Sequence, residues 1–354
     1  MSDLFADSLV PGSGKPDQAP FPWQLQHWQA LLQKHSDKQL AHAYLISGEA
    51  GLGKHQFALA FARLLLCLEP ISGRACGQCP NCLTGGDDFH PDILEIRSEQ
   101  DGRDIQVDQV RELAAFLRQT SHSGRSKIVL LHDAHDMNTA ASNALLKTLE
   151  EPSAKSLLLL VTHMPGSLMA TIRSRCQRIV MHPPTWPQGR AWLAELGHKL
   201  LLDLPDSELH KLWQEAGARP LHLLAMLAQD YLSQRQEFES VLCQLAAGRL
   251  SLLDAVNKLA RQGEGVVLAH LQHLSTILIK HFSSGDWPAD SSKEMQQLAQ
   301  ALPSDKMALQ GLLDFYQQVV VAQRQLAGSS NPNPRLLLEA LMQQWSRLPR
   351  ASRA

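Results

Sequence analysis

Aromatic residues are scarce in this chain of 354 residues, and neither basic nor acidic residues predominate. Phe, Trp and Tyr make up 5% of it, and 33 basic residues against 35 acidic ones leave a formal net charge of -2. A protein that binds nucleic acid over its whole surface is usually more basic. We therefore expect any contact with nucleic acid to be local or to be supplied mainly by partner proteins.

Long hydrophobic runs are also absent. No stretch of about 18 uncharged apolar residues occurs, so the sequence predicts no membrane span. The N-terminus lacks a basic segment followed by an apolar core, which is the pattern of a secretory signal. We therefore expect a cytoplasmic protein, whose six cysteines are reduced thiols or metal ligands rather than disulfides.

The remaining pattern indicates three folded regions after a flexible tail. Residues 1–20 are rich in Asp, Ser, Gly and Pro and show no periodicity, as expected of a mobile segment. From 21 to 183, short apolar runs alternate with stretches of helical periodicity, which indicates a parallel sheet covered by helices. Residues 184–229 then predict a small group of helices, and residues 230–354 predict a helical bundle.

A glycine-rich loop follows the first apolar run. The segment Gly48-Glu49-Ala50-Gly51-Leu52-Gly53-Lys54-His55 ends a predicted strand and opens a helix, which is the context of a phosphate-binding P-loop. Its glycines would let backbone N–H groups approach phosphates, and Lys54 would supply a positive charge. The eighth position should hold Mg²⁺ through a Ser or Thr hydroxyl. Here that residue is His55, and a neutral imidazole is a poor ligand for so hard a cation.

The second half of an ATPase site is also altered. The predicted strand 127–131 leads into His132-Asp133-Ala134-His135, which lacks two adjacent acids. With His135 as the anchor, His132 takes the position of the metal-binding Asp, and Asp133 that of the water-activating Glu. These two defects argue against ATP hydrolysis by this chain. They leave open a weak binding of ATP or ADP, and the simpler interpretation that the loop is only a strand-to-helix turn.

Four cysteines form the pattern C-x8-C-x2-C-x2-C, at Cys67, Cys76, Cys79 and Cys82. Cysteines two residues apart place their sulfurs on one tight turn, which suits a tetrahedral Zn²⁺ ion. Four thiolates leave no open coordination position, so such a zinc site would be structural rather than catalytic. Free thiols or a redox pair are the alternative.

Several motifs resemble the ATPase domain of bacterial clamp-loader subunits, members of the AAA+ family with a RecA-like parallel sheet. The resemblance extends over about residues 22–181 and is much weaker in the C-terminal half. It rests on the glycine loop, the cysteine spacing and four further segments: His42-Ala43-Tyr44-Leu45, His90-Pro91-Asp92, residues 143–152, and Ser174-Arg175-Cys176.

Three kinds of subunit occur in that family. The ATP-hydrolysing gamma and tau subunits keep the Ser or Thr after the lysine and the adjacent acids, and the delta subunit lacks the Ser-Arg-Cys motif. The delta prime kind keeps that motif and the zinc cysteines while its own ATP site decays, and this sequence resembles it. The retained Gly51, Gly53 and Lys54 make the decay partial.

The resemblance implies an AAA+-like domain over 21–183 with a zinc module at 67–82, a helical lid over 184–229 and a helical collar over 230–354. The collar would join gamma or tau and delta subunits in a hetero-pentamer. That complex, a part of the DNA polymerase III holoenzyme at the nucleoid, would load the β sliding clamp on primed DNA. No segment resembles a polymerase active site, so the nucleotidyltransferase activity would belong to the holoenzyme.

The resemblance also gives Arg175 a role, as an arginine finger supplied in trans to the ATP of a neighbouring subunit. A guanidinium is always charged and presents a planar fork of donors, which suits a γ-phosphate. The local sequence alone would favour an ordinary solvated basic turn. The main alternative for the whole chain is a gamma/tau-like motor subunit with an unorthodox ATP site. A second is an unrelated zinc-containing protein that binds nucleic acid.

Overall fold

The computed structural model describes residues 19–84, 90–98, 104–196, 204–228, 230–287, 291–302, 306–327 and 332–348. The predicted flexible tail, residues 1–20, lies almost wholly outside these ranges. The chain divides into two compact units, Met1–Ala228 and Gln229–Ala354. None of the helices in the described ranges has the length and apolar character needed to cross a bilayer.

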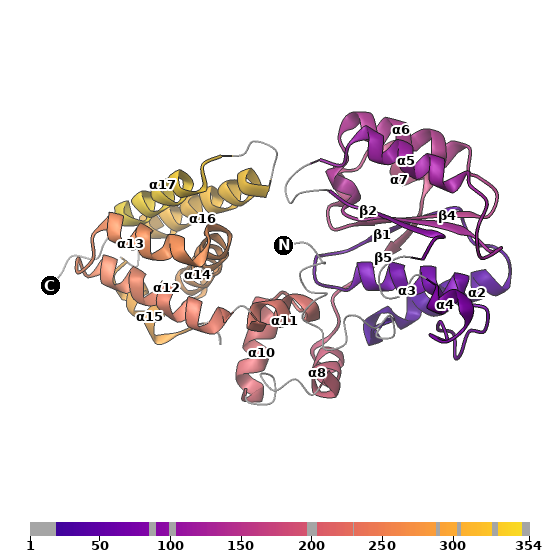
Figure 1. Ribbon diagram of the computed structural model, residues 1–354. Helices are drawn as coiled ribbons and strands as arrows, with labels where there is room; N and C mark the ends of the chain where they lie inside the picture. The colour runs from indigo at the N-terminus through magenta and orange to yellow at the C-terminus, as the bar shows by residue number, and fades with distance from the viewer. Residues whose placement is uncertain are drawn as a thin grey trace. The chain divides into compact units, whose positions relative to one another are not determined.

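A five-stranded sheet forms the centre of the first unit (Figure 1). Its order is β2-β3-β4-β1-β5, and all neighbouring strands run parallel, as predicted. β1 and β3 are buried along their whole length because helices cover both faces of the sheet. The strands are β1 (Ala43–Ser47), β2 (Ile93–Ile96), β3 (Lys127–Leu131), β4 (Ser156–Thr162) and β5 (Gln177–Val180).

Alternate residues of each strand point into two different hydrophobic cores, one on each face of the sheet. In β1, Tyr44 and Ile46 pack with the residues of α2 and α3, whereas Ala43 and Leu45 pack with those of α5, α6 and α7 (Figure 1). The helices and short 3-10 turns of this part are η1 (Pro22–Gln24), α2 (Leu25–Ser36), α3 (Lys54–Leu66), α4 (Pro80–Leu83), α5 (Val107–Leu117), η2 (Ala134–Asp136), α6 (Thr139–Glu150), η3 (Pro165–Ser167) and α7 (Ala170–Arg175).

Three further helices lie in the described part of the region predicted as a lid, which belongs to the first unit. They are α8 (Trp186–Leu196), α10 (Asp206–Glu215) and α11 (Pro220–Ala228). Gly189 of α8 is buried against the indole of Trp213, where a methyl group would overlap the ring. Trp192 meets the rings of Phe21 and Trp23 edge-on, at centroid distances of 5.5 and 5.2 Å. These contacts join the helices to the segment that precedes the sheet.

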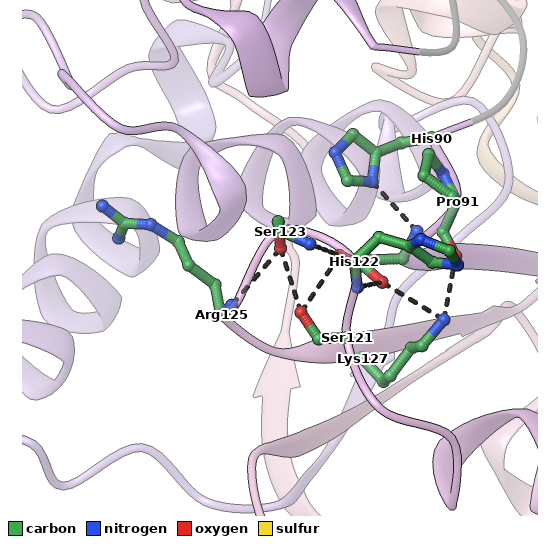
Figure 2. A network of polar contacts seen from close by, with 8 residues as sticks. His90, Pro91, Ser121, His122, Ser123, Arg125 and Lys127 are labelled. Atoms are coloured by element: carbon green, nitrogen blue, oxygen red, sulfur yellow. Dashed lines mark hydrogen bonds and ion pairs between the residues drawn. The ribbon is translucent and has the colours of Figure 1, made fainter.

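A buried ion pair lies at the start of β2 (Figure 2). Lys127 Nζ is 3.1 Å from Asp92 Oδ1, and the two side chains are 3% and 0% exposed. The carboxylate also accepts hydrogen bonds from the backbone N–H of His122 and of Ser123, at 2.8 and 2.7 Å, and from the hydroxyl of Ser121 at 3.1 Å. Burial raises the pKa of Asp92, but these hydrogen bonds outweigh it and hold the pKa well below its ordinary range.

The same network explains the His90-Pro91-Asp92 motif. Lys127 Nζ donates a second hydrogen bond to the carbonyl of Pro91 at 2.9 Å, and His90 Nδ1 accepts from the backbone N–H of Asp92 at 3.0 Å. The ammonium group also lies 4.2 Å from the centre of the Phe116 ring, as a cation–π contact. The motif therefore ties the start of β2 to the start of β3.

The second unit consists of helices alone within its described residues, as predicted. Its core is built around α14, which packs along α16 through leucines such as Leu271, Leu274 and Leu312. The elements are α12 (Tyr231–Ala246), α13 (Leu252–Leu259), η4 (Ala260–Gln262), α14 (Glu264–Ser284), α15 (Lys293–Gln300), α16 (Lys306–Ala327) and α17 (Pro334–Arg347).

One histidine lies inside this helical core. His270 is 1% exposed, and its ring lies 4.7 Å from that of Tyr231 and 5.3 Å from that of Phe238, centroid to centroid. Neither of its nitrogens has a hydrogen-bond partner among the described residues. Burial, helped by the charges of His273 and Arg235, lowers the pKa of His270 to about 4. The imidazole is therefore neutral at pH 7.

Candidate functional site

The glycine-rich loop joins the end of β1 to the start of α3, as the sequence predicts. Gly48, Gly51 and Gly53 have positive φ angles, of 146°, 86° and 76°. A Cβ atom on Gly51 would lie 2.7 Å from Cβ of His222, and one on Gly53 would overlap the ring of Phe21. Glycine is thus required at both positions by backbone conformation and by close approach.

Lys54 is buried, and its ammonium group bonds within the loop. Its side chain is 1% exposed, and Nζ donates a hydrogen bond to the carbonyl of Glu49 at 2.7 Å. The lysine predicted to meet a phosphate thus begins α3, and its ammonium group bonds to a backbone carbonyl of the loop.

Two other segments of the first unit hold the loop from outside. Gln24 Nε2 donates to the carbonyls of Leu52 and Gly53 at 2.9 and 2.8 Å. At the start of α11, the backbone N–H of Leu221 donates to the carbonyl of Gly51 at 3.1 Å. Arg219, the residue before α11, lies with Nε 3.7 Å from a carboxylate oxygen of Glu49. The helical region 204–228 therefore closes directly onto the loop.

Three side chains meet where a P-loop ATPase would hold its metal ion. His55 comes from the first turn of α3, Glu95 from β2, and His132 from the residue after β3, and their ligand atoms lie within 4.8 Å of one another. His132 Nε2 is 3.0 Å from Glu95 Oε2, and the rings of His55 and His132 are 4.3 Å apart. Burial raises the pKa of Glu95, but the hydrogen bond and charge of His132 lower it more, to below its usual value.

A second group of polar side chains lies at the carboxyl ends of β3 and β4. His163 Nδ1 is 3.3 Å from Asp133 Oδ1, the rings of His135 and His163 are 4.1 Å apart, and His135 Nδ1 is 3.1 Å from the hydroxyl of Thr162. Burial and the neighbouring His163 lower the pKa of His135 to about 4. Burial and the charge of Asp133 raise the pKa of Asp136 to about 6.

These residues do not fit Mg²⁺, the cation that accompanies ATP in such sites. Mg²⁺ requires oxygen ligands in an octahedral arrangement. At the two positions that should supply a hydroxyl and a carboxylate, the structure places the imidazoles of His55 and His132, which are 7% and 2% exposed. Asp133 is paired with His163. We therefore derive no hydrolytic step at this loop.

Arg175, the predicted arginine finger, is the last residue of α7 and lies at the surface of the first unit. Its side chain is 37% exposed. Nη2 is 2.6 Å from Oε1 of Glu150, the last residue of α6, and Nη1 donates to the carbonyl of Thr171 at 3.1 Å. The carboxylate of Glu150 is itself half exposed, so the pair is a surface ion pair of modest strength.

The four predicted metal-binding cysteines converge at the C-terminal end of α3. Sγ of Cys67 is 4.0 Å from that of Cys79, and Sγ of Cys76 is 3.9 Å from that of Cys82. All four sulfurs lie within 4.8 Å of one another. In a tetrahedral site with zinc–sulfur bonds of about 2.3 Å, neighbouring sulfurs lie about 3.8 Å apart. The donor set and its spacing therefore fit Zn²⁺ with little adjustment.

Backbone N–H groups around this cluster favour thiolates. The N–H of Cys76 lies 3.2 Å from Sγ of Cys67, that of Leu68 lies 3.5 Å from Sγ of Cys79, and that of Cys79 lies 3.3 Å from Sγ of Cys76. Burial raises the pKa of Cys79, but the backbone donors of Leu68 and Cys82 outweigh it and lower the pKa to about 6. Burial raises the pKa of Cys67 and of Cys82, so a zinc ion, which binds thiolates rather than thiols, would displace protons from these two groups on binding.

Some residues of the site escaped the sequence reasoning. Glu95 and His163 carry no motif, and Glu150 lies within the segment 143–152 that resembles the family, but the sequence assigned it no contact with Arg175. Gln24 and His222 belong to segments whose only sequence signal was helical periodicity. All five act through contacts that are distant along the chain, so no local pattern could have identified them.

The fold and the site together define a P-loop-type α/β domain that is followed by helices and has the imidazoles of His55 and His132 beside its glycine-rich loop. The comparisons with known proteins agree with this class. A family model described as "DNA polymerase III, delta subunit" matches residues 23–185, and one described as "DNA polymerase III, delta subunit, C terminal" matches residues 229–347.

Individual relatives narrow the assignment. The DNA polymerase III subunit delta' of Pseudomonas aeruginosa is 34% identical over 93% of this chain and 98% of its own length. That of Escherichia coli is 32% identical over 73% of this chain and 75% of its own length. The tau/gamma subunit of Haemophilus influenzae is 30% identical over 85% of this chain but only 46% of its own length. The chain belongs to the DNA polymerase III delta prime subunit family.

Proposed function

We propose that this chain is a non-motor subunit of the bacterial clamp loader, which donates Arg175 in trans to the ATP site of a neighbouring gamma or tau subunit. Its partners would be gamma or tau and delta in a hetero-pentamer, joined through the helices of residues 230–354. Through that complex it would help load the β sliding clamp on primed DNA, as part of the polymerase III holoenzyme in the cytoplasm. Membership of the delta prime family supports the clamp-loader role.

One observation carries the non-motor part of the proposal. Imidazoles occupy both positions that should offer oxygen ligands to Mg²⁺, at His55 and His132. A chain with these ligands would lack the metal that bridges and neutralises the phosphates during transfer. The site would instead act as a fixed scaffold, with any binding of ATP or ADP weak and resting on Lys54 and the loop amides.

The surface position of Arg175 supports its assignment as the finger. A guanidinium at the end of a short helix can reach a partner, and a finger supplied in trans is worth about 10³-fold or more in rate. To do so it must leave Glu150, 2.6 Å away. An exposed pair of this kind is worth about 1 kcal/mol or less, which a γ-phosphate would readily outweigh. We therefore expect Glu150→Gln to alter stimulation by no more than about fivefold.

The cysteine cluster is proposed to hold a structural zinc ion. Cys67, Cys76, Cys79 and Cys82 would bind it as four thiolates, and a closed site of this type stabilises the fold without taking part in a reaction. The full chain should contain one tightly bound zinc per molecule. Cys76→Ser should lose that zinc and lower the thermal stability, whereas Cys243→Ser, outside the cluster, should leave both unchanged.

The finger is tested by steady-state ATP hydrolysis in a mixture of gamma or tau, delta, the β clamp and primed DNA. Adding this chain should stimulate hydrolysis, and Arg175→Ala should abolish the stimulation at the site it serves. Arg175→Lys should fail as well, because lysine keeps the charge but lacks the planar fork. Arg178→Ala, an exposed arginine on β5, is the matched control and should stimulate as the wild type does. Size-exclusion chromatography must show that every variant still assembles.

The same assay distinguishes the alternative of a gamma/tau-like motor subunit. This alternative requires Mg²⁺-dependent hydrolysis by the chain alone, with loss of activity in Lys54→Ala. If the isolated chain turns over ATP in this way, the non-motor proposal is wrong. If stimulation survives Arg175→Ala in an assembled complex, the finger assignment is wrong even though the family membership stands.

A further inference from the structure

The three side chains that replace the magnesium ligands form a cluster of their own. His55 begins α3, Glu95 lies in β2 and His132 follows β3, so the fold brings them together from three separate elements. One ligand atom from each lies within 4.8 Å of the other two. Glu95 Oε2 and His132 Nε2 are already 3.0 Å apart. The replaced residues therefore form a new set of possible metal ligands, two imidazoles and one carboxylate, at the place where an ATPase would hold Mg²⁺.

We propose that His55, Glu95 and His132 bind a divalent transition-metal ion of the Zn²⁺ or Co²⁺ class. Two imidazoles and one carboxylate are the donors that these borderline cations prefer, and the same combination holds zinc in several hydrolytic enzymes. Mg²⁺ is excluded by the same donors, because it requires oxygen ligands in an octahedral arrangement. The inference does not depend on the arginine finger or on the clamp-loader role.

The dimensions of the cluster suit such an ion. Zinc bonds of about 2.0–2.1 Å to nitrogen or oxygen place neighbouring ligand atoms of a tetrahedral site about 3.3 Å apart. The observed 3.0 Å contact lies close to that value, and the 4.8 Å limit on the other separations leaves only small side-chain adjustments. Binding would replace the hydrogen bond between His132 and Glu95 by two bonds to one metal.

The two histidines of the cluster are buried, whereas its carboxylate is partly exposed to solvent. The imidazoles of His55 and His132 are 7% and 2% exposed, whereas the side chain of Glu95 is 32% exposed. The nitrogens are thus held in place by the surrounding core, and an ion can enter past the carboxylate. Three protein ligands leave one position for water or another ligand, in contrast to the four-thiolate site.

The neighbouring group around His163 offers an internal control. It also contains two imidazoles and a carboxylate, and as in the first cluster an imidazole contacts the carboxylate, His163 with Asp133 at 3.3 Å. In addition, His135 Nδ1 lies 3.1 Å from the hydroxyl of Thr162, a partner outside the group. Both groups offer two imidazoles and one carboxylate and would respond alike to an unspecific effect of added metal. A variant in each group therefore assigns the ion to one of them.

The test uses the full-length chain after loosely held metal has been removed with a chelator and the cysteine-bound zinc has been quantified. Co²⁺ is then added, and its binding is followed by isothermal titration calorimetry and by visible absorption. We expect one further equivalent to bind with d–d absorption but without new thiolate-to-metal charge transfer, which separates it from the cysteine site. Glu95→Gln and His132→Gln should each weaken this binding by at least about tenfold, whereas His163→Ala should leave it unchanged.

Three outcomes would overturn the proposal. These are an unchanged Co²⁺ affinity in both Glu95→Gln and His132→Gln, a loss of binding in His163→Ala with retention in the other two, and displacement of Co²⁺ by an equal concentration of Mg²⁺. Glu95→Gln keeps a hydrogen-bonding group at a partly exposed position, so it should fold normally. Circular dichroism and an unchanged content of cysteine-bound zinc would verify this for each variant.

Discussion

Replacing Asp92 with Asn would leave the ammonium group of Lys127 buried without its counter-charge. The two side chains are 0% and 3% exposed, and four donors converge on the carboxylate, from Lys127, Ser121, His122 and Ser123. An amide has one acceptor oxygen in place of two, and its NH₂ group would face donors. Removing one member of a buried pair typically destabilises a protein by about 3–5 kcal/mol. We expect Asp92→Asn to fall in that range.

The size of this destabilisation depends on the burial of the ion pair, so an ion pair exposed to solvent provides the matched control. Arg111 and Asp108 form a contact of 2.7 Å between side chains that are 70% and 83% exposed. Such pairs contribute about 1 kcal/mol or less. Asp108→Asn should therefore change the free energy of unfolding by less than about 1 kcal/mol. A double substitution, Asp92→Leu with Lys127→Met, should recover most of the stability that Asp92→Asn loses, because no buried charge remains.

Urea denaturation followed by circular dichroism would measure these free energies at a common m-value. The chain has two compact units, so hydrogen–deuterium exchange of peptides covering β2 and β3 would assign the loss to the first unit. The reasoning fails if Asp92→Asn loses no more stability than Asp108→Asn. It also fails if exchange speeds up in the helices of the second unit and not in these strands.

Two further predictions concern buried positions. His270, whose pKa is lowered to about 4, is protonated more readily in the unfolded chain, so it destabilises the second unit increasingly as the pH falls from 6.5 toward 4. Relative to wild type, His270→Leu should therefore gain about 2 kcal/mol of unfolding free energy between pH 7 and pH 5, and a pH-independent difference in urea titrations would contradict this. Gly189→Ala should lose about 1–3 kcal/mol in thermal melts, since the methyl group would overlap the Trp213 ring. In Gly265→Ala, on α14, the methyl group meets open space, and this control should be neutral or slightly stabilising.

The sequence predicted the frame of the molecule well. A parallel sheet followed from apolar runs that alternate with helical periodicity, and the five strands lie where those runs occur. The helical C-terminal region followed from periodicity such as that of Leu312 and Val319, which face the core from α16. Such features are local, because a strand or a helix face is set by residues a few positions apart.

The candidate sites could be predicted from local sequence patterns only in part. The cysteine spacing predicted a cluster, and the sulfurs of Cys67, Cys76, Cys79 and Cys82 do converge. The glycine loop and Lys54 were also identified, because backbone conformation and a short motif specify them. Whether the cysteines hold zinc and whether Arg175 acts in trans stay predictions, to be decided by the measurements above.

What the sequence determined by itself was the order of elements, the phosphate-loop turn and the loss of two oxygen ligands at His55 and His132. Only the tertiary structure decided which side chains those imidazoles contact. Glu95 is 37 residues away from His132 in sequence, yet it lies 3.0 Å away in space. His222 and Gly51 are likewise distant in sequence and close in space, and so are Glu150 and Arg175. Contacts of this kind arise from the packing of whole strands and helices, whose register depends on the entire core and not on any local pattern.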